Sequence, residues 1–315
     1  MARHWIAPDF GSPDAWRFEE YDVTSPGAGE VTIRVHAAGV NPADAKHVAQ
    51  PRPGVEMPVP IGYEVSGVLT AIGPDTDIVT GPAVVGDEVI AFRVRGGYAS
   101  EITVPAQKVL RKPAALTHAE AANLLLAGTT AAEMLQIVRA EPGEVLLLHG
   151  ASGAVGVSVL QQAALRGIRV IGTARRERFD EVRRFGGVPV EYGDGLADRV
   201  EAARDAVGAA HIDAALDAVG TDEAVTVSRE LVGNPSRIVT IAAPAAAAEH
   251  GFHAIAGSMP DSARFRDGIR EHLVELAESG ALVVPVAREF ALDQAPQALA
   301  LLASGHPGGK IALIP

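Results

Sequence analysis

The stretch Glu144-Val-Leu-Leu-Leu-His149-Gly-Ala-Ser-Gly-Ala-Val-Gly156 decides the fold of this chain. Its first half is a continuous apolar run, which is typical of a β-strand that is buried on both faces of a parallel sheet. Its second half places glycines directly after that strand, and the pattern over residues 154–166 predicts a helix. A strand, a glycine turn and a helix in succession indicate the start of a βαβ unit.

The spacing Gly150-x-x-Gly153-x-x-Gly156 suits a turn that approaches the pyrophosphate of a dinucleotide. Gly150 allows a tight turn, Gly153 lets backbone amides approach the anion, and Gly156 lets the helix pack closely on the strand. Free N–H groups and the helix dipole then favour a negative charge. The spacing is a variant of G-x-G-x-x-G, and glycine turns also occur without a ligand, so the interpretation depends on the flanking strand and helix. The other residues expected to line the nucleotide here are Ser152, Ala154 and Val155.

Downstream of this turn, predicted strands alternate with predicted helices. The strands are expected at 169–173, 188–192, 212–217 and 237–241, and the helices at 179–185, 196–207 and 223–231. Such alternation predicts an α/β fold with a doubly wound parallel sheet. The alanine-rich segment 242–248 that follows predicts a surface loop or a short helix.

The residues before the turn follow another pattern, with short β-like runs at 31–35, 65–71, 88–92 and 98–104 separated by glycine and proline. They predict a separate β-rich domain. Thr117-His-Ala-Glu120 is a capping box that begins a helix over 119–127, and a second helix is expected over 130–139. In the tail, helices are expected over 264–279 and 292–304, and strands over 282–286 and 310–314.

Composition limits the possible partners. The chain has 315 residues, enough for two domains that each bury a core. Its formal net charge of -12 and its 4% aromatic content disfavour nucleic acid and anionic membranes as partners. No window approaches the roughly 18 apolar residues of a membrane span, and the first residues lack a leader pattern. There is no cysteine, which excludes disulfides, thiolate metal ligands and cysteine nucleophiles. We expect a cytoplasmic protein with a small-molecule partner.

The residues after the second predicted strand of the parallel sheet indicate which nucleotide is bound. An NAD site places an acidic residue there, yet Val170-Ile-Gly-Thr-Ala174 is followed by Arg175 and Arg176. Two guanidinium groups favour the 2′-phosphate of NADPH, which a carboxylate would repel. Alternatively, both arginines belong to a solvated basic face, because three more arginines follow on the next predicted helix. Tyr192 either adds a hydroxyl to the phosphate pocket or is an aromatic residue of an edge strand.

Several motifs, taken in order, resemble the medium-chain dehydrogenase/reductase superfamily, in particular its zinc-independent quinone oxidoreductase and alkenal or enoyl reductase branch. The resemblance covers nearly the whole chain. Besides the glycine turn, its motifs are Ala37-Ala-Gly-Val-Asn-Pro-Ala-Asp-Ala-Lys46, Ile61-Gly-Tyr-Glu-Val-Ser-Gly67, Val85-Gly-Asp-Glu-Val89, Gly96-Gly-Tyr-Ala-Ser100, Asp217-Ala-Val-Gly220 and His306-Pro-Gly-Gly-Lys310.

The resemblance implies an architecture. A GroES-like substrate domain would span 1–117, a Rossmann NADPH-binding domain 118–253, and residues 254–315 would return to the GroES-like domain. The cleft would lie at the junction of the two domains. A homodimer is also what the family implies.

Zinc-dependent members of the superfamily hold their catalytic metal through a Cys, a His and a second Cys. Here the matching positions carry Asn41, Tyr63 and an apolar residue near Leu126, and the short step from Phe92 to Gly97 leaves no room for a four-cysteine structural lobe. The ten histidines are scattered and show no helical pairing. These side chains make no credible zinc site, so we predict no metal.

The resemblance also implies the chemistry, which is hydride transfer from NADPH to a quinone or an α,β-unsaturated carbonyl without a Lewis acid. Asn41, Lys46 and Tyr63 are candidate donors to the acceptor oxygen, which gains negative charge. Each has a structural alternative: Asn41 before Pro begins a turn, Lys46 extends into solvent, or Tyr63 only lines the pocket. Asp44 and Glu64 match acidic positions of the family for which a structural role is expected.

Further cofactor contacts follow from the resemblance alone. They are Thr130, Val219, Ile241 and Ser258. The tyrosine common in quinone reductases at the place of Lys46 is absent, and Ala132 replaces an aromatic residue, so the acceptor stays open. Two alternatives remain: an enoyl reductase of secondary metabolism, and a non-catalytic NADPH-binding or redox-responsive protein on the same fold.

Overall fold

The computed structural model describes residues 1–52, 54–305 and 308–315, which form two compact units. Unit 1 comprises Met1–Leu126 and Glu271–Pro315, and unit 2 comprises Ala127–Arg270. The boundaries between the units fall within helices α3 (Leu125–Ile137) and α9 (Pro260–Glu278). They lie later in the chain than the boundaries expected after residues 117 and 253. Two residues of the last sequence motif, His306 and Pro307, lie outside the described residues.

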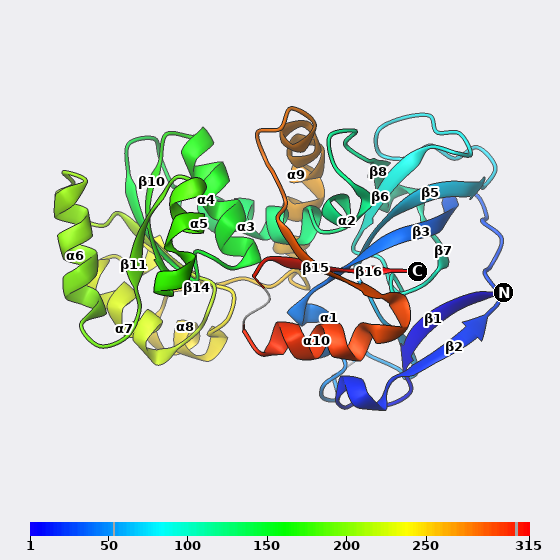
Figure 1. The fold of residues 1–315 in the computed structure, drawn as a ribbon, viewed down its shortest axis with the longest axis horizontal. Helices are drawn as coiled ribbons and strands as arrows, with labels where there is room; N and C mark the ends of the chain where they lie inside the picture. Colours follow the sequence, from blue (N-terminus) through cyan, green and yellow to red (C-terminus); the bar gives the residue numbers. More distant parts are fainter. Residues whose placement is uncertain (53, 306–307) are drawn as a thin grey trace. The chain divides into compact units, whose positions relative to one another are not determined.

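Unit 2 is built on a six-stranded sheet with the order β11-β10-β9-β12-β13-β14 (Figure 1). Every neighbouring pair is parallel. The strands are β9 (Val145–His149), β10 (Arg169–Ala174), β11 (Gly187–Glu191), β12 (Ala214–Asp217), β13 (Ile238–Thr240) and β14 (His253–Ala254). The chain builds outward from β9 in one direction and then from β12 in the other, so the predicted doubly wound sheet is confirmed.

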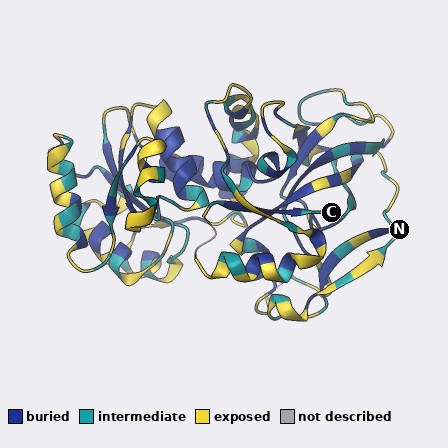
Figure 2. Cartoon of the chain, viewed as in Figure 1, coloured by how far each residue is buried: buried dark blue, intermediate teal, exposed yellow. Residues whose placement is uncertain are grey.

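Helices cover both faces of this sheet. Besides α3 they are α4 (Ala154–Leu165), α5 (Phe179–Arg184), α6 (Leu196–Ala206), α7 (Asp222–Leu231) and α8 (Pro244–His250). Leu146 and Leu148 of β9 pack in the core formed with α3 and α4, while Val145 and Leu147 pack in the core formed with α6 and α7. Every residue of β9 is buried, as expected of a strand buried on both faces, and Figure 2 shows the strands inside unit 2 mostly in dark blue.

Unit 1 contains a seven-stranded sheet and a three-stranded sheet with the order β2-β1-β4. The larger sheet follows the order β15-β16-β3-β5-β6-β8, and β7 also pairs with β3. Its strands are β3 (Glu30–Val40), β5 (Glu64–Ile72), β6 (Glu88–Phe92), β7 (Glu101–Pro105), β8 (Val109–Arg111), β15 (Val286–Ala291) and β16 (Lys310–Ile314). The carboxy-terminal tail returns to this unit, because β16 pairs antiparallel with β3.

The smaller elements of unit 1 complete its fold. They are β1 (Ala2–Ala7), β2 (Arg17–Tyr21), β4 (Val59–Pro60), α1 (Pro42–Lys46), α2 (His118–Ala121) and α10 (Ala295–Ala303). The predicted capping box is confirmed, since the Thr117 hydroxyl accepts from the Glu120 N–H, and Glu120 accepts from the Thr117 N–H. Among the described helices, none combines the length and the apolarity needed to cross a membrane.

Some element boundaries differ from the sequence prediction. The strand expected at 282–286 is wrong, because Pro285 has no N–H to give to a ladder, and β15 begins only at Val286. The helix expected over 119–127 ends at Ala121, and α3 begins earlier than predicted. The segment 242–248, left open between loop and helix, enters α8, whose first residue is Pro244.

Candidate functional site

The carboxyl ends of the unit 2 strands bring most of the predicted cofactor residues to one edge of the sheet. Gly150 follows β9, Arg175 follows β10 and Tyr192 follows β11. Val219 lies two residues after β12, and Ile241 follows β13. In an open parallel sheet, ligands bind outside the carboxyl ends of the strands, at the point where the strand order reverses. Here that point lies between β9 and β12.

Close packing explains two glycines of the turn. Gly150 has a φ of 80°, in the left-handed region, and a Cβ added there would lie 2.7 Å from Cγ1 of Val219. A Cβ on Gly156 would lie 2.2 Å from the carbonyl oxygen of Gly150. At Gly153 the same oxygen would be 3.3 Å away, a much milder approach. The packing of the chain itself therefore requires Gly150 and Gly156, whereas at Gly153 the chain leaves room for a Cβ.

The first turn of α4 offers open donors. Its first intrahelical bond is donated by Val157 to the Gly153 carbonyl at 2.8 Å. No described residue accepts from the backbone N–H of Ala154, Val155 or Gly156. Such N–H groups, together with the helix dipole, favour an anion such as a pyrophosphate.

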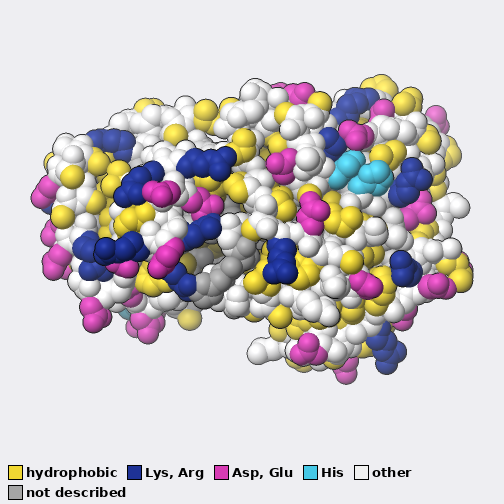
Figure 3. Space-filling model, viewed as in Figure 1, with side chains coloured by type: hydrophobic (Ala, Val, Ile, Leu, Met, Phe, Trp, Pro, Cys, Tyr) yellow, Lys and Arg dark blue, Asp and Glu magenta, His cyan; other side chains and the backbone are white. Residues whose placement is uncertain are grey.

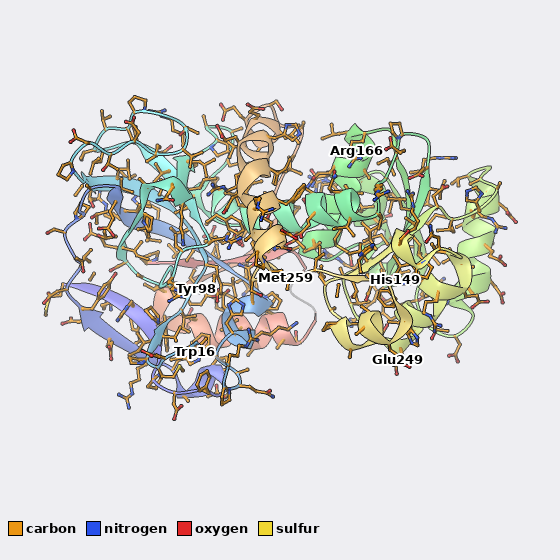
Figure 4. The ribbon with its side chains drawn as sticks, turned by 180° about the vertical axis from the view of Figure 1, so that it is seen from behind. Trp16, Tyr98, His149, Arg166, Glu249 and Met259 are labelled. Carbon is orange, nitrogen blue, oxygen red and sulfur yellow. The ribbon has the colours of Figure 1, made fainter. Side chains whose placement is uncertain are left out.

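His149 adds no charge beside this turn. It is 1% exposed, and its Nε2 lies 3.1 Å from the Ser228 hydroxyl (its place in unit 2 is labelled in Figure 4). Burial lowers the pKa of His149 to about 4, although the nearby Asp217 acts in the opposite direction. The imidazole is therefore neutral at pH 7, and the attraction for an anion comes from the backbone.

Asp217 holds the loops after β12 and β13, a role that the sequence prediction missed. Its Oδ1 accepts from the N–H of Val219 at 2.9 Å and of Gly220 at 2.8 Å. Its Oδ2 accepts from the Thr240 hydroxyl at 2.7 Å. Thr240 in turn accepts from the N–H of Ala242 and of Ala243. A buried carboxylate at a strand end, inside one of the recognised motifs, was the signal available in the sequence.

The arginines after β10 separate into paired and unpaired groups. Arg176 donates to Glu191 at 2.8 Å, Arg183 pairs with Asp180 at 2.9 Å, and Arg178 pairs with Glu181. Figure 3 shows basic and acidic side chains interspersed over unit 2. Arg175 differs, because its Nε donates to the Tyr192 hydroxyl at 2.8 Å and no described carboxylate pairs with it. Its charge is therefore available to an anion.

The turn that carries Glu191 and Tyr192 is held from two helices. Arg199 of α6 donates to the carbonyls of Glu191, Gly193 and Asp194 at 2.9, 2.8 and 2.7 Å. Glu223 of α7 accepts from the Gly193 N–H at 3.0 Å. The backbone on both sides of Tyr192 is thus held, and its hydroxyl accepts from Arg175 Nε, so the other N–H groups of Arg175 have no described partner.

Thr130 and Ser258 do not stand at strand ends. Thr130 is buried on α3, and Ser258 is exposed just before α9. Glu133 of α3 accepts from Arg266 Nε at 2.6 Å and also bonds the Ser262 hydroxyl. This buried contact joins the start of α9 to α3, and the Ser258 segment leads directly into it.

In unit 1 the predicted residue Asn41 belongs to a polar cluster made of Asn41, Asp44, Glu64, Tyr98 and Lys310. The Lys310 ammonium donates to Asn41 Oδ1 at 2.5 Å and to Glu64 Oε1 at 3.3 Å. The Asn41 Nδ2 donates to Glu64 Oε1 at 2.9 Å and to the Gly39 carbonyl at 3.4 Å. Asn41 is 2% exposed and both ends of its amide are engaged, which favours the structural alternative over a role as donor to a substrate oxygen.

Asp44 closes the other side of the cluster. Its Oδ2 accepts from the Asn41 N–H at 2.7 Å and from the Tyr98 hydroxyl at 2.9 Å (Tyr98 is labelled in Figure 4). Its Oδ1 is buried without a hydrogen bond from any described residue. Burial raises the pKa of Asp44 to about 7, and the charge of Glu64 acts in the same direction, while both hydrogen bonds oppose the shift.

The positions that match the family's metal ligands do not fit a zinc ion. The cation beside Asn41 and Glu64 is the Lys310 ammonium, and Glu64 Oε2 accepts from the Leu126 N–H at 2.9 Å. The sequence supplies no thiolate. Within residues 1–52, 54–305 and 308–315, no His, Cys, Asp and Glu side chains gather into a group that could hold a metal.

Lys46 and Tyr63 remain open donors in unit 1. Lys46 is the exposed last residue of α1, and its ammonium meets no partner in the described chain. The next residue, His47, packs its ring edge-on against the Tyr63 ring, with centroids 4.7 Å apart. Burial and the nearby Arg52 lower the pKa of His47, so the neutral ring supports Tyr63 without adding charge.

Comparison with known proteins gives consistent similarities. The model of the alcohol dehydrogenase GroES-like domain matches residues 27–114, and that of the zinc-binding dehydrogenase matches residues 191–313. A 2-haloacrylate reductase from Burkholderia sp is 29% identical over 97% of this chain and 96% of that protein. A quinone oxidoreductase from Pseudomonas aeruginosa is 26% identical over 100% of both chains. A solved mycobacterial protein complexed with NADPH is 25% identical, covers 100% of both chains and has a TM-score of 0.84.

Proposed function

Because this chain belongs to the quinone and enoyl reductase branch of the medium-chain dehydrogenase/reductase superfamily, we propose that it is an NADPH-dependent reductase of quinones or α,β-unsaturated carbonyl compounds that works without a metal ion. The observation that carries the proposal is the open charge of Arg175 beside the glycine turn. It supports a nucleotide with a 2′-phosphate, and the mycobacterial relative complexed with NADPH supports the same cofactor.

Different strand-end residues of unit 2 bind different parts of NADPH. The N–H groups of Ala154, Val155 and Gly156 bind the pyrophosphate, and Val219 packs against Gly150. Arg175 binds the 2′-phosphate, because a guanidinium already fixed at Nε by Tyr192 presents its remaining N–H groups at little entropic cost. Arg176 contributes less, since it neutralises Glu191, which would otherwise repel the phosphate.

The acceptor is activated by donors rather than by a Lewis acid. Bound NADPH supplies a hydride for the electrophilic carbon. As the acceptor oxygen gains negative charge, Lys46 or the Tyr63 hydroxyl donates a hydrogen bond to it. A proton then reaches the α-carbon of an enone, or the oxygen of a quinone, from one of these donors or from water. Asn41 has no part in this step, because its amide is engaged with Lys310 and Glu64.

A panel of acceptors tests the proposal. The purified protein is mixed with NADPH or NADH and with 1,4-benzoquinone, 2-cyclohexenone or crotonyl-CoA, and cofactor oxidation is followed. We expect turnover of a quinone or the enone, with kcat/KM about tenfold or more higher for NADPH than for NADH. Turnover of the thioester alone would favour an enoyl reductase of secondary metabolism. Tight NADPH binding without turnover of any acceptor would contradict the proposal and favour a non-catalytic NADPH-binding protein. A homodimer and a cytoplasmic location stay predictions.

A further inference from the structure

Arg93, the first residue after β6, has a backbone conformation that costs free energy. Its φ is 60°, in the left-handed region that residues with a side chain rarely adopt. Among the described non-glycine residues, only Asp75 and Arg139 share a positive φ. Such strain persists where the surroundings fix it, and it concentrates at ligand-binding sites. A glycine would adopt this conformation without strain, so the arginine side chain is what needs a reason.

The surroundings of Arg93 fix its backbone on both sides. Its carbonyl accepts from the Lys108 ammonium at 2.5 Å. The next residue, Val94, donates its N–H to the Tyr63 carbonyl at 3.1 Å. Three residues later the chain is held again, by bonds from Gly97 to Gly62 and from Tyr98 to Ile61. The segment that carries Arg93 therefore lies rigidly alongside the residues around Tyr63.

The Arg93 guanidinium has no partner in the described chain. Its Nη1 is buried and makes no hydrogen bond, and the side chain as a whole is half-buried. The buried Arg266, in contrast, is paired with Glu133 at 2.6 Å. A buried donor on a charged group that lacks an acceptor is expensive, and native structures retain such groups where a ligand completes them. Arg93 is thus a half-buried cation that no described carboxylate pairs with.

The position of Arg93 indicates which molecule brings that anion. Phe92 pairs with Glu64 in the sheet, and Val94 bonds to Tyr63, so Arg93 flanks one of the two open donors of the proposed reaction. Because the backbones of Tyr63 and Val94 are hydrogen-bonded, an acceptor that contacts Tyr63 also passes the segment that carries Arg93. The phosphates of a thioester carrier are too many bonds from the alkene to reach both places. A carboxylate near the double bond fits, and the planar guanidinium matches its geometry.

We propose that Arg93 binds a carboxylate carried by the acceptor, so that the preferred substrates are α,β-unsaturated carbonyl compounds that also carry a carboxylate near the double bond. The proposal rests on the reductase function proposed above and narrows its substrate class. Arg93 orients the acceptor through the carboxylate, and Lys46 and Tyr63 stay free for the oxygen that gains charge.

An acid and its ester test this pairing. The substrates are 4-oxopent-2-enoate and its methyl ester, which share the same enone, and the variants are Arg93→Gly and, as a matched charge control, Arg95→Gln. For the wild type we expect kcat/KM to be about tenfold or more higher for the acid. Arg93→Gly brings the ratio close to one and leaves the ester rate and the KM for NADPH nearly unchanged, whereas Arg95→Gln behaves as the wild type.

Thermal unfolding separates this role from a structural one. Because glycine relieves the left-handed strain, Arg93→Gly keeps or raises the Tm while the preference for the acid is lost. A lowered Tm with an unchanged acid-to-ester ratio would show that Arg93 serves the fold and would overturn the proposal. Equal rates for the acid and the ester in the wild type would overturn it as well.

A binding measurement keeps the inference testable apart from turnover. Calorimetric titration without NADPH uses 4-oxopentanoate, a saturated analogue that lacks the reducible double bond. We expect it to bind the wild type and to bind Arg93→Gly about tenfold or more weakly. Inorganic phosphate is the control anion and is expected to bind more weakly. Equal affinity of wild type and variant for 4-oxopentanoate overturns the inference. Absence of turnover of every acceptor, with this difference in binding intact, contradicts the reductase proposal alone.

Discussion

The polar cluster of unit 1 and the strand-end edge of unit 2 are both rich in polar groups, but they satisfy them differently. In the cluster, Lys310, Asn41 and Glu64 bond to one another and are nearly unexposed. At the strand-end edge, the amides of Ala154 and Val155 and the charge of Arg175 have no described partner. A polar residue at a position shared with the family therefore has a structural role where other residues of the chain bind it. It has a binding role where only a ligand can supply its partner.

The largest expected effect is on the stability of the polar cluster in unit 1. Asp44 has a pKa of about 7 in the fold against an ordinary value of 3.8. Its pKa is raised, so the stability it contributes is fully present below about pH 4 and is lost as the pH rises through about 7. We expect Asp44→Asn, which keeps an acceptor oxygen for Asn41 and Tyr98, to remove this loss of up to about 4 kcal/mol.

Urea unfolding of wild type and Asp44→Asn at pH 5, 7 and 8.5 measures the effect. The free energy of unfolding of the variant should gain on that of wild type as the pH rises, while NADPH affinity stays the same. Parallel pH profiles for the two proteins would mean that Asp44 ionises normally in the fold. That result would contradict the raised pKa of Asp44.

The next effect is on NADPH binding by the glycine turn. A Cβ at position 156 would lie 2.2 Å from the Gly150 carbonyl oxygen, and backbone must move to accept it. We expect Gly156→Ala to weaken NADPH binding about 100-fold or more, because the donors of the first helical turn are displaced. Gly233→Ala is the matched control in the same unit, because no atom lies within 4 Å of a Cβ added there, and we expect a change of about threefold or less. Fluorescence titration with NADPH measures both, and similar losses in the two variants would contradict the packing argument.

A smaller effect tests which arginine binds the 2′-phosphate of NADPH. We expect Arg175→Ala to lower kcat/KM for NADPH about tenfold or more, while kcat/KM for NADH changes about twofold or less. Arg176→Ala should have the weaker effect, since Arg176 is already paired with Glu191. Steady-state kinetics with both nucleotides measures the two variants. An Arg176 effect larger than the Arg175 effect would reverse the assignment, and unchanged preference in both would place the phosphate elsewhere.

Much of unit 2 could be predicted from the sequence, because its signals are local. The apolar run before Gly150, the glycine spacing and the alternation of strands and helices each depend on a few neighbouring residues. The motif positions also predicted which residues meet at the strand ends, since strand ends of a parallel sheet share one edge. A shared pocket for Arg175 and Tyr192 was one of two alternatives for Tyr192, and in the structure Arg175 Nε lies 2.8 Å from the Tyr192 hydroxyl.

Unit 1 resisted prediction because its decisive contacts are distant in sequence. Lys310 and Asn41 are 269 residues apart, and only their pairing shows that the Asn41 amide is engaged. No pattern in Phe92-Arg-Val-Arg95 reveals that Arg93 is left-handed, because the strain is imposed by Lys108 and Tyr63. The counter-charge of Glu191 on Arg176 was likewise invisible, since it depends on the register of two adjacent strands.

The central claim is that this chain reduces its acceptor with NADPH and without a metal ion, and the most direct test is activity after metal removal. The protein is treated with dipicolinate and EDTA, its metal content is measured by mass spectrometry, and NADPH-dependent reduction of 1,4-benzoquinone and 2-cyclohexenone is followed. We expect undiminished kcat when less than about 0.1 zinc ion per chain remains. Loss of activity in step with loss of zinc, and its return when zinc is added, would show instead that the reaction needs zinc.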